Sequence, residues 1–118
     1  MDDELLSAKT IFVVDRNVES THAKTAMDSF KGTTHKHVMD AVESRKTMPM
    51  VEDIWASMLA FGCDRQVPLV AVGGGITGDV AGFAAATFMR GVPLIQIPTT
   101  LLAMVDASIG GETGGNLP

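Results

Sequence analysis

Glycines between two apolar runs form the stretch of this chain whose residue types and spacing could bind a phosphate. Gly73, Gly75 and Gly78 match the spacing G-x-G-x-x-G, after a β-branched run and before an alanine-rich run. Glycine allows the backbone to turn sharply and to approach a ligand closely. A helix that starts there directs free N–H groups at an anion. The pattern predicts a phosphate or dinucleotide site, and tight packing of the helix on the strand is the alternative explanation.

The residues that follow the glycines disfavour an ordinary nicotinamide dehydrogenase. Such enzymes carry an acidic residue about 20 residues further on, at the end of the next strand. Here the next apolar run ends in Pro98, Thr99 and Thr100. Threonine hydroxyls can hydrogen-bond ribose or phosphate oxygens, but they do not replace that carboxylate.

Polar residues after the first predicted strand form a second candidate site. The run 10–14 is apolar and β-branched, and Asp15 and Asn17 follow it. Ligands of open α/β sheets bind beyond the carboxyl ends of the strands, so these two side chains could contact a ribose. Ordinary turn or helix-cap chemistry is the alternative interpretation.

The histidines and the cysteine do not predict a metal site. We expect His35 and His37 to point to opposite faces of a strand, and no Asp, Glu or Cys stands at a metal-ligand spacing from them. Both are therefore interpreted as exposed polar residues. Cys63 is the single cysteine, which excludes an intrachain disulfide and favours a buried thiol.

Strand and helix patterns alternate along the chain and predict an α/β fold, a Rossmann-like doubly wound, mostly parallel sheet. The predicted strands are 10–14, 38–42, 69–72 and 94–97, and the predicted helices are 18–30, 50–61 and 80–89. In the helix 50–61, one face collects large apolar residues at helical spacing: Val51, Ile54, Trp55, Met58 and Leu59. Gly62 then stands at the position of a C-terminal cap.

Length and charge limit the class of protein. The 118 residues predict one domain, 1–118, with 46% hydrophobic residues and a net charge of -5. The acidic balance argues against a nucleic-acid partner, because no basic stripe is available to meet phosphates. No apolar run reaches transmembrane length, and the short acidic start lacks the features of a signal peptide. These observations predict a cytoplasmic protein without a membrane partner.

The run from Gly73 to Gly111 resembles the NAD-binding half of the 3-dehydroquinate synthases. It contains M-R-G-V, P-T-T-L-L and V-D-A-S-I-G-G together. The resemblance implies a shikimate-pathway cyclase that converts 3-deoxy-arabino-heptulosonate 7-phosphate to 3-dehydroquinate and releases phosphate. It further implies that this chain is the N-terminal domain only, without the C-terminal helical metal domain, and inactive alone. A sedoheptulose 7-phosphate cyclase fragment and a non-catalytic NAD-binding remnant are the alternatives.

The resemblance also implies roles for individual residues. Arg90 and Asp106 would bind the sugar-acid phosphate, Arg90 across a subunit contact if the protein is a homodimer. Asp79 would lie against NAD while favouring the first turn of its helix. The divalent metal of the family, zinc or cobalt, would have no ligands here, because they belong to the C-terminal domain. The residues implied to bind NAD are Asp15, Asn17, Glu43, Lys46, Gly74, Gly75, Ile76, Asp79, Thr99 and Thr100.

Glu112 is the main departure from the family pattern. The family has a substrate-binding lysine at this position, in G-G-K-T-G-x-N. A carboxylate in place of the cation inverts the interaction with an anionic substrate. We therefore expect substrate binding at position 112 to be lost.

Overall fold

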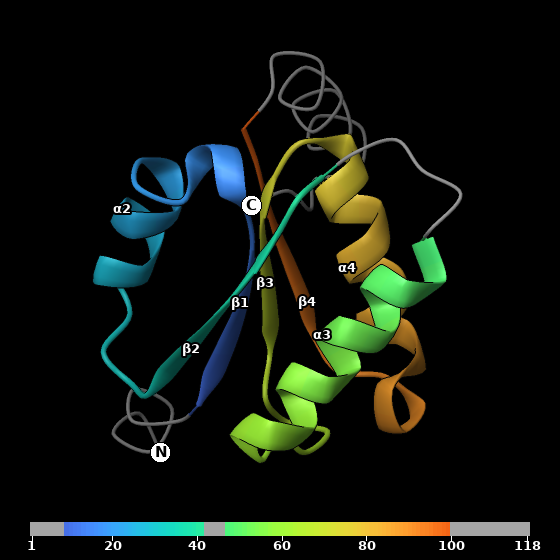
Figure 1. Cartoon of the computed structure of the whole chain (residues 1–118). Helices are drawn as coiled ribbons and strands as arrows, with labels where there is room; N and C mark the ends of the chain where they lie inside the picture. Colours follow the sequence, from blue (N-terminus) through green and yellow to red (C-terminus); the bar gives the residue numbers. More distant parts are fainter. Residues whose placement is uncertain (1–8, 42–46, 100–118) are drawn as a thin grey trace, which may run out of the picture.

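A parallel sheet forms the centre of the molecule (Figure 1). The computed structural model describes residues 9–41 and 47–99. Its strands are β1 (Thr10–Asp15), β2 (Thr34–Met39), β3 (Leu69–Gly73) and β4 (Leu94–Pro98), in the order β2-β1-β3-β4. The connecting elements are the 3-10 turn η1 (Arg16–Val18), α2 (His22–Asp28), α3 (Thr47–Phe61), α4 (Gly75–Thr87) and the 3-10 turn η2 (Phe88–Arg90). The predicted doubly wound α/β fold is confirmed.

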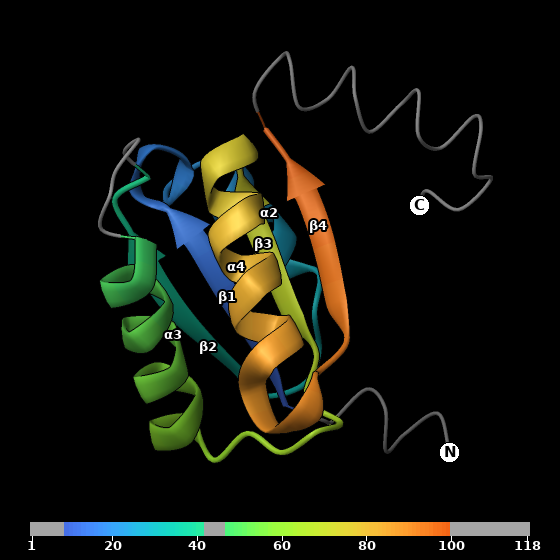
Figure 2. The same cartoon turned by 90° about the vertical axis from the view of Figure 1, so that its right-hand side faces the viewer.

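Helices cover both faces of the sheet, because a parallel sheet buries both of its faces. Figure 2 shows α3 and α4 in front of the sheet and α2 behind it. β1 lies between β2 and β3, and all six of its residues are buried. Its side chains alternate between the two layers: Ile11 and Val13 join the core under α3 and α4, whereas Phe12 and Val14 join the core under α2.

The core-facing side of α3 differs from the prediction at one residue. Val51, Ile54 and Met58 are fully buried, but Leu59 is 68% exposed. Leu59 lies one step of about 100° beyond Met58, which carries it past the edge of the apolar stripe. Gly62 caps the helix as predicted, with a left-handed φ of +79°. The N–H of Cys63, which is itself buried, donates to the carbonyl of Met58 at 2.9 Å.

β2 begins at Thr34, four residues before the predicted start of that strand, 38. Both of its histidines face α3: the His35 ring stacks on Phe61, with centroids 5.1 Å apart, and His37 Nδ1 lies 2.6 Å from Ser57 Oγ. The expectation of opposite faces was wrong, because side chains two residues apart in a strand share a face. Both are half-buried, so the interpretation as exposed residues was also wrong.

α4 begins at Gly75, five residues before the predicted start of that helix, 80. Glycine and threonine are weak helix formers, so the sequence pattern placed the start at the alanine-rich run. The helix is followed by residues with left-handed φ, at 47° for Met89, 74° for Arg90 and 107° for Gly91. Within residues 9–41 and 47–99, no helix has the length and apolarity needed to cross a lipid bilayer.

Candidate functional site

The order of the strands predicts the ligand crevice of an open α/β sheet between the carboxyl ends of β1 and β3. From β1 the chain moves outward to β2, then returns over β1 to form β3 and β4 on the other side. The carboxyl ends of β1 and β3 therefore lie side by side while their connections leave in different directions. In open α/β sheets this switch point is where ligands bind. It lies at the top of the sheet in Figure 1.

Asp15 and Gly73 end these two strands in close contact. A Cβ on Gly73 would lie 2.9 Å from Asp15 Cβ and 2.7 Å from Thr77 Cβ. Only glycine allows the strand end to fit between these two side chains. Asp15 is 8% exposed, and its Oδ1 accepts a hydrogen bond of 2.9 Å from the Asn17 N–H. The carboxylate is thus held at the rim of the crevice.

The first turn of α4 opens onto the same crevice. Gly74 is the N-cap residue and offers no side chain to the first N–H groups of the helix, which have no partner within the helix. A Cβ on Gly75 would meet no atom within 4 Å. An anion can therefore approach the helix N-terminus over Gly74 and Gly75.

Thr77, which the sequence did not single out, adds a polar atom beneath this turn. It is fully buried, and its Oγ1 has no hydrogen-bond partner. A buried hydroxyl without a partner is costly, so Thr77 Oγ1 lowers the stability of the chain as it stands. No sequence signal distinguishes this threonine from a helix residue of ordinary function.

The packing explanation for the glycines is confirmed at some positions, and the phosphate site stays a prediction that concerns others. Gly73 and Gly78 serve packing: a Cβ on Gly78 would lie 2.7 Å from Gln96 Oε1 of β4. Gly74 and Gly75 leave the backbone accessible. The turn is therefore built as a dinucleotide cradle is built, with some glycines for close packing and others for ligand approach.

Other residues expected at the cofactor lie close to this turn. The Thr99 N–H donates to the Gly73 carbonyl at 2.9 Å, so Thr99 lies beside the end of β3. Ile76 is half-buried against the core. Asp79 is exposed but is the fifth residue of α4, so its expected place in the first turn was wrong. The helix begins earlier than the alanine-rich run suggested.

Asp15 also occupies the position of the acidic residue that the glycine motif seemed to lack. That residue belongs at the end of the strand next to the glycine-bearing strand. Here the neighbouring strand is β1, which precedes the glycines in the sequence. No acidic residue follows Gly78 at the usual spacing, because the order of the strands in the sheet differs from their order in the chain.

An ion pair next to Asp15 was not predicted from the sequence. Arg16 Nε lies 2.7 Å from Asp40 Oδ1, which joins the residues that follow β1 and β2. The hydrogen bond to Asp40 raises the pKa of Arg16. The predicted strand 38–42 places Asp40 inside a strand, whereas β2 ends at Met39 and leaves Asp40 at the carboxyl edge of the sheet.

Arg90 lies far from the residues at the carboxyl ends of β1 and β3. It follows α4, whose first residue is at the crevice and whose 13 residues span roughly 20 Å. Arg90 is exposed, and η2 lies at the bottom of Figure 1. The remaining expected site residues, Glu43, Lys46, Thr100, Asp106 and Glu112, lie outside the described residues.

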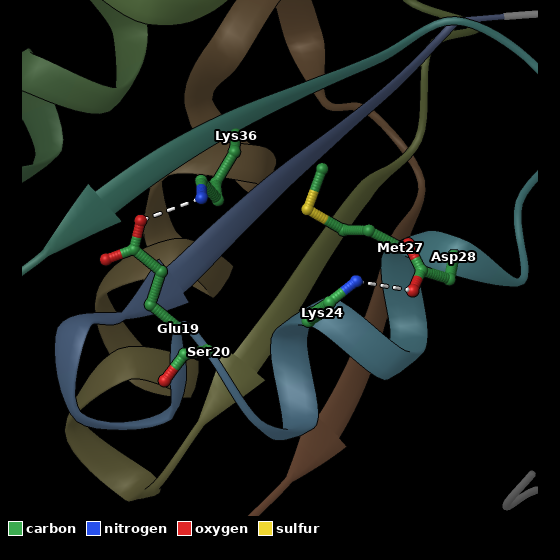
Figure 3. A pocket seen from close by; sticks show the side chains of 6 residues that line it. All are labelled: Glu19, Ser20, Lys24, Met27, Asp28 and Lys36. Atoms are coloured by element: carbon green, nitrogen blue, oxygen red, sulfur yellow. Dashed lines mark hydrogen bonds and ion pairs between the residues drawn. The ribbon is translucent and has the colours of Figure 1, made fainter.

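A second hollow lies between α2 and β2 (Figure 3). Its lysines are paired with its carboxylates: Lys36 Nζ lies 2.7 Å from Glu19 Oε2, and Lys24 Nζ lies 3.1 Å from Asp28 Oδ2. The hydrogen bond from Lys36 lowers the pKa of Glu19. These pairings make the hollow a weaker candidate for an anion than the N-terminus of α4. In residues 9–41 and 47–99, no three His, Cys, Asp or Glu side chains gather as a metal site would require.

Known proteins match most of this chain in sequence. Residues 36–118 match the family described as 3-dehydroquinate synthase N-terminal. The 3-dehydroquinate synthase of Salinibacter ruber is 44% identical over 119 residues, which cover 98% of this chain and 32% of that protein. The chain thus spans about a third of the length of the curated relatives it matches.

Solved structures of cyclases share the fold. A 2-deoxy-scyllo-inosose synthase complexed with carbaglucose-6-phosphate, NAD+ and Co2+ superposes with a TM-score of 0.80 at 34% identity, over 88% of this chain and 29% of that one. The 2-epi-5-epi-valiolone synthase of Streptomyces hygroscopicus, with NAD+ and Zn2+ bound, has a TM-score of 0.75 at 36% identity, over 87% of this chain and 30% of that one.

Proposed function

The chain belongs to the 3-dehydroquinate synthase family, and from that premise we propose that it is the NAD-binding part of a cyclase of this kind. The observation that carries the proposal is the meeting of three features at one switch point: Asp15, the glycine turn and the open N-terminus of α4. A dinucleotide needs an acceptor for a ribose and a cradle for its pyrophosphate, and these features supply both.

In this proposal each group has a defined task. The N-terminus of α4 holds the pyrophosphate over Gly74 and Gly75, and Asp15 with Asn17 accepts the hydroxyls of the adenosine ribose. Bound NAD supplies a reversible hydride acceptor. Lys46 and Glu43 would complete the adenosine side, and Thr99 with Thr100 would face the other half of the cofactor.

The proposed reaction is that of the shikimate pathway: 3-deoxy-arabino-heptulosonate 7-phosphate yields 3-dehydroquinate and phosphate. Arg90 and Asp106 would bind this substrate, with Arg90 acting across a homodimer contact because it lies far from the crevice of its own chain. Zinc or cobalt would be held by residues outside this chain, and a cytoplasmic location suits the pathway. We expect the chain alone to bind NAD without turnover, and Glu112 to weaken substrate binding.

A related sugar-phosphate cyclase is the second candidate, since the solved neighbours are cyclases with other product names. Sedoheptulose 7-phosphate would be its substrate. A full-length enzyme that carries this domain, assayed with both sugar phosphates, separates the two. If it turned over neither substrate but still bound NAD, a non-catalytic binding module would remain.

Calorimetric titration of the 118-residue chain with NAD tests the cofactor site. We expect saturable binding that Asp15→Asn weakens. Asp64→Asn is the matched control, because Asp64 Oδ1 accepts from the Gln66 N–H at 2.8 Å in the same type of turn, before rather than after a strand. A cooperatively folded chain that bound no NAD at millimolar concentration would contradict the proposal.

A further inference from the structure

We propose that Arg16 and Asp40 set the preference between NAD and NADP: Asp40 occupies Arg16 in an ion pair and so disfavours a dinucleotide with a 2′-phosphate. The inference rests on the proposed function, because it assigns the specificity of the same cofactor site.

The ion pair lies at the carboxyl edge of the sheet, where a ribose would extend from the crevice. Arg16 directly follows Asp15 of β1, and Asp40 directly follows β2. Their side chains are 60% and 67% exposed, with Nε and Oδ1 2.7 Å apart. β2 is the next strand outward from β1. A nucleoside that runs outward from the glycine turn over Asp15 therefore reaches this pair next.

The 2′ position of the adenosine ribose is the only point at which the two dinucleotides differ. A carboxylate near that position accepts the 2′-hydroxyl of NAD, and a free arginine accommodates the 2′-phosphate of NADP. This chain has both groups, but the arginine is hydrogen-bonded to a carboxylate. A 2′-phosphate would meet Asp15 and Asp40 as like charges and would have to separate Arg16 from its partner.

Within residues 9–41 and 47–99, the other charges around Arg16 do not reverse this balance. Glu19 adds a second negative charge within electrostatic reach of Arg16. The nearby cation, Lys36, is paired with Glu19 at 2.7 Å. Removal of the Asp40 charge would therefore leave Arg16 free to bind the 2′-phosphate of NADP. An exposed ion pair contributes little to folding, so Asp40→Asn should leave the fold intact.

The test titrates NAD and NADP separately into the 118-residue chain and into Asp40→Asn, with the ratio of the two dissociation constants as the readout. We expect Asp40→Asn to shift this ratio toward NADP by about five- to tenfold, the effect of one charge contact near water. Asp28→Asn is the matched control, since it removes a carboxylate from another exposed ion pair, Lys24–Asp28, at the far end of α2. It should leave the ratio unchanged.

A second variant shows whether Arg16 mediates the effect. Arg16→Gln combined with Asp40→Asn should lose the gain in NADP binding, because the released cation is gone. If the chain binds NAD but Asp40→Asn shifts the ratio no more than Asp28→Asn does, the assignment is overturned while the proposed function stands. A persisting gain in the double variant also overturns it. If the unaltered chain binds neither dinucleotide, the proposed function fails and the assignment fails with it.

Discussion

Within the glycine turn, Gly73 and Gly75 differ in the space that is available for a side chain. Gly73 lies between Asp15 and Thr77, with no space for a methyl group. We expect Gly73→Ala to lower the free energy of unfolding by about 1–3 kcal/mol, because both neighbours must shift. Urea denaturation measures this change.

Gly75→Ala is the matched control for that variant. A Cβ there meets no atom within 4 Å, and alanine is a better helix former than glycine. Its stability should be equal to or above that of the unaltered chain, whereas its affinity for NAD should fall, because the methyl group occupies the path of the pyrophosphate. Equal losses of stability in both variants would contradict this division of roles.

Thr77 lowers the free energy of unfolding of the chain without cofactor. Its Oγ1 is buried and has no partner. Thr77→Val keeps the shape and removes that atom, so we expect the free energy of unfolding to rise by about 1 kcal/mol. Affinity for NAD should fall, since the hydroxyl would then be missing from the floor of the crevice. Thermal unfolding with and without NAD measures both effects, and a less stable Val variant without NAD would refute the prediction.

At the scale of elements, the contact between β2 and α3 depends on pH through His37. Burial beside Ser57 lowers the pKa of His37, and the nearby charge of His35 lowers it further, whereas Asp53 opposes this. In the unfolded chain His37 titrates near its ordinary value of about 6.5. Between the two values the unfolded chain binds more protons, so stability is lost as the pH falls below about 6.5.

Denaturant titrations from pH 8 to pH 5 measure this loss. His37→Gln should flatten the slope, since glutamine can hydrogen-bond Ser57 without titrating. His22→Gln is the control, because His22 is exposed and belongs to α2, which lies across the sheet from α3 (Figure 2). The same slope in His37→Gln as in the unaltered chain would exclude His37 as its source.

The elements also show how far the sequence could predict this molecule. The alternation of strands and helices and the cap at Gly62 followed from local patterns. The position of β2 did not, because 34–39 contains a lysine and two histidines, and only the packing of α3 buries the histidines. The start of α4 was missed because glycine propensity opposes it. The contact of Asp15 with Gly73 depends on strand order, which no local pattern encodes.

At the scale of the whole molecule, β4 leaves one side of the sheet apolar. Among the described strands it pairs only with β3, and Leu94 and Ile95 are 37% and 45% exposed, with Phe83 of α4 at 48%. Exposed apolar edge strands promote association. We expect the 118-residue chain to associate as its concentration rises, and Ile95→Lys to reduce this. Sedimentation velocity measures it, and Arg65→Lys, an exposed residue outside the sheet, is the control.

The central position of β1 also affects how the chain folds during its synthesis. β1 is made first, yet its buried residues are covered only when β3, roughly 60 residues later, has joined it. At ribosomal rates of synthesis this delay lasts roughly 3 to 12 s. During that interval β1 can pair only with β2 and lacks its second neighbour, and parallel pairing is slow to form. The newborn chain is therefore most open to chaperones, and to aggregation, before the glycine turn leaves the ribosome.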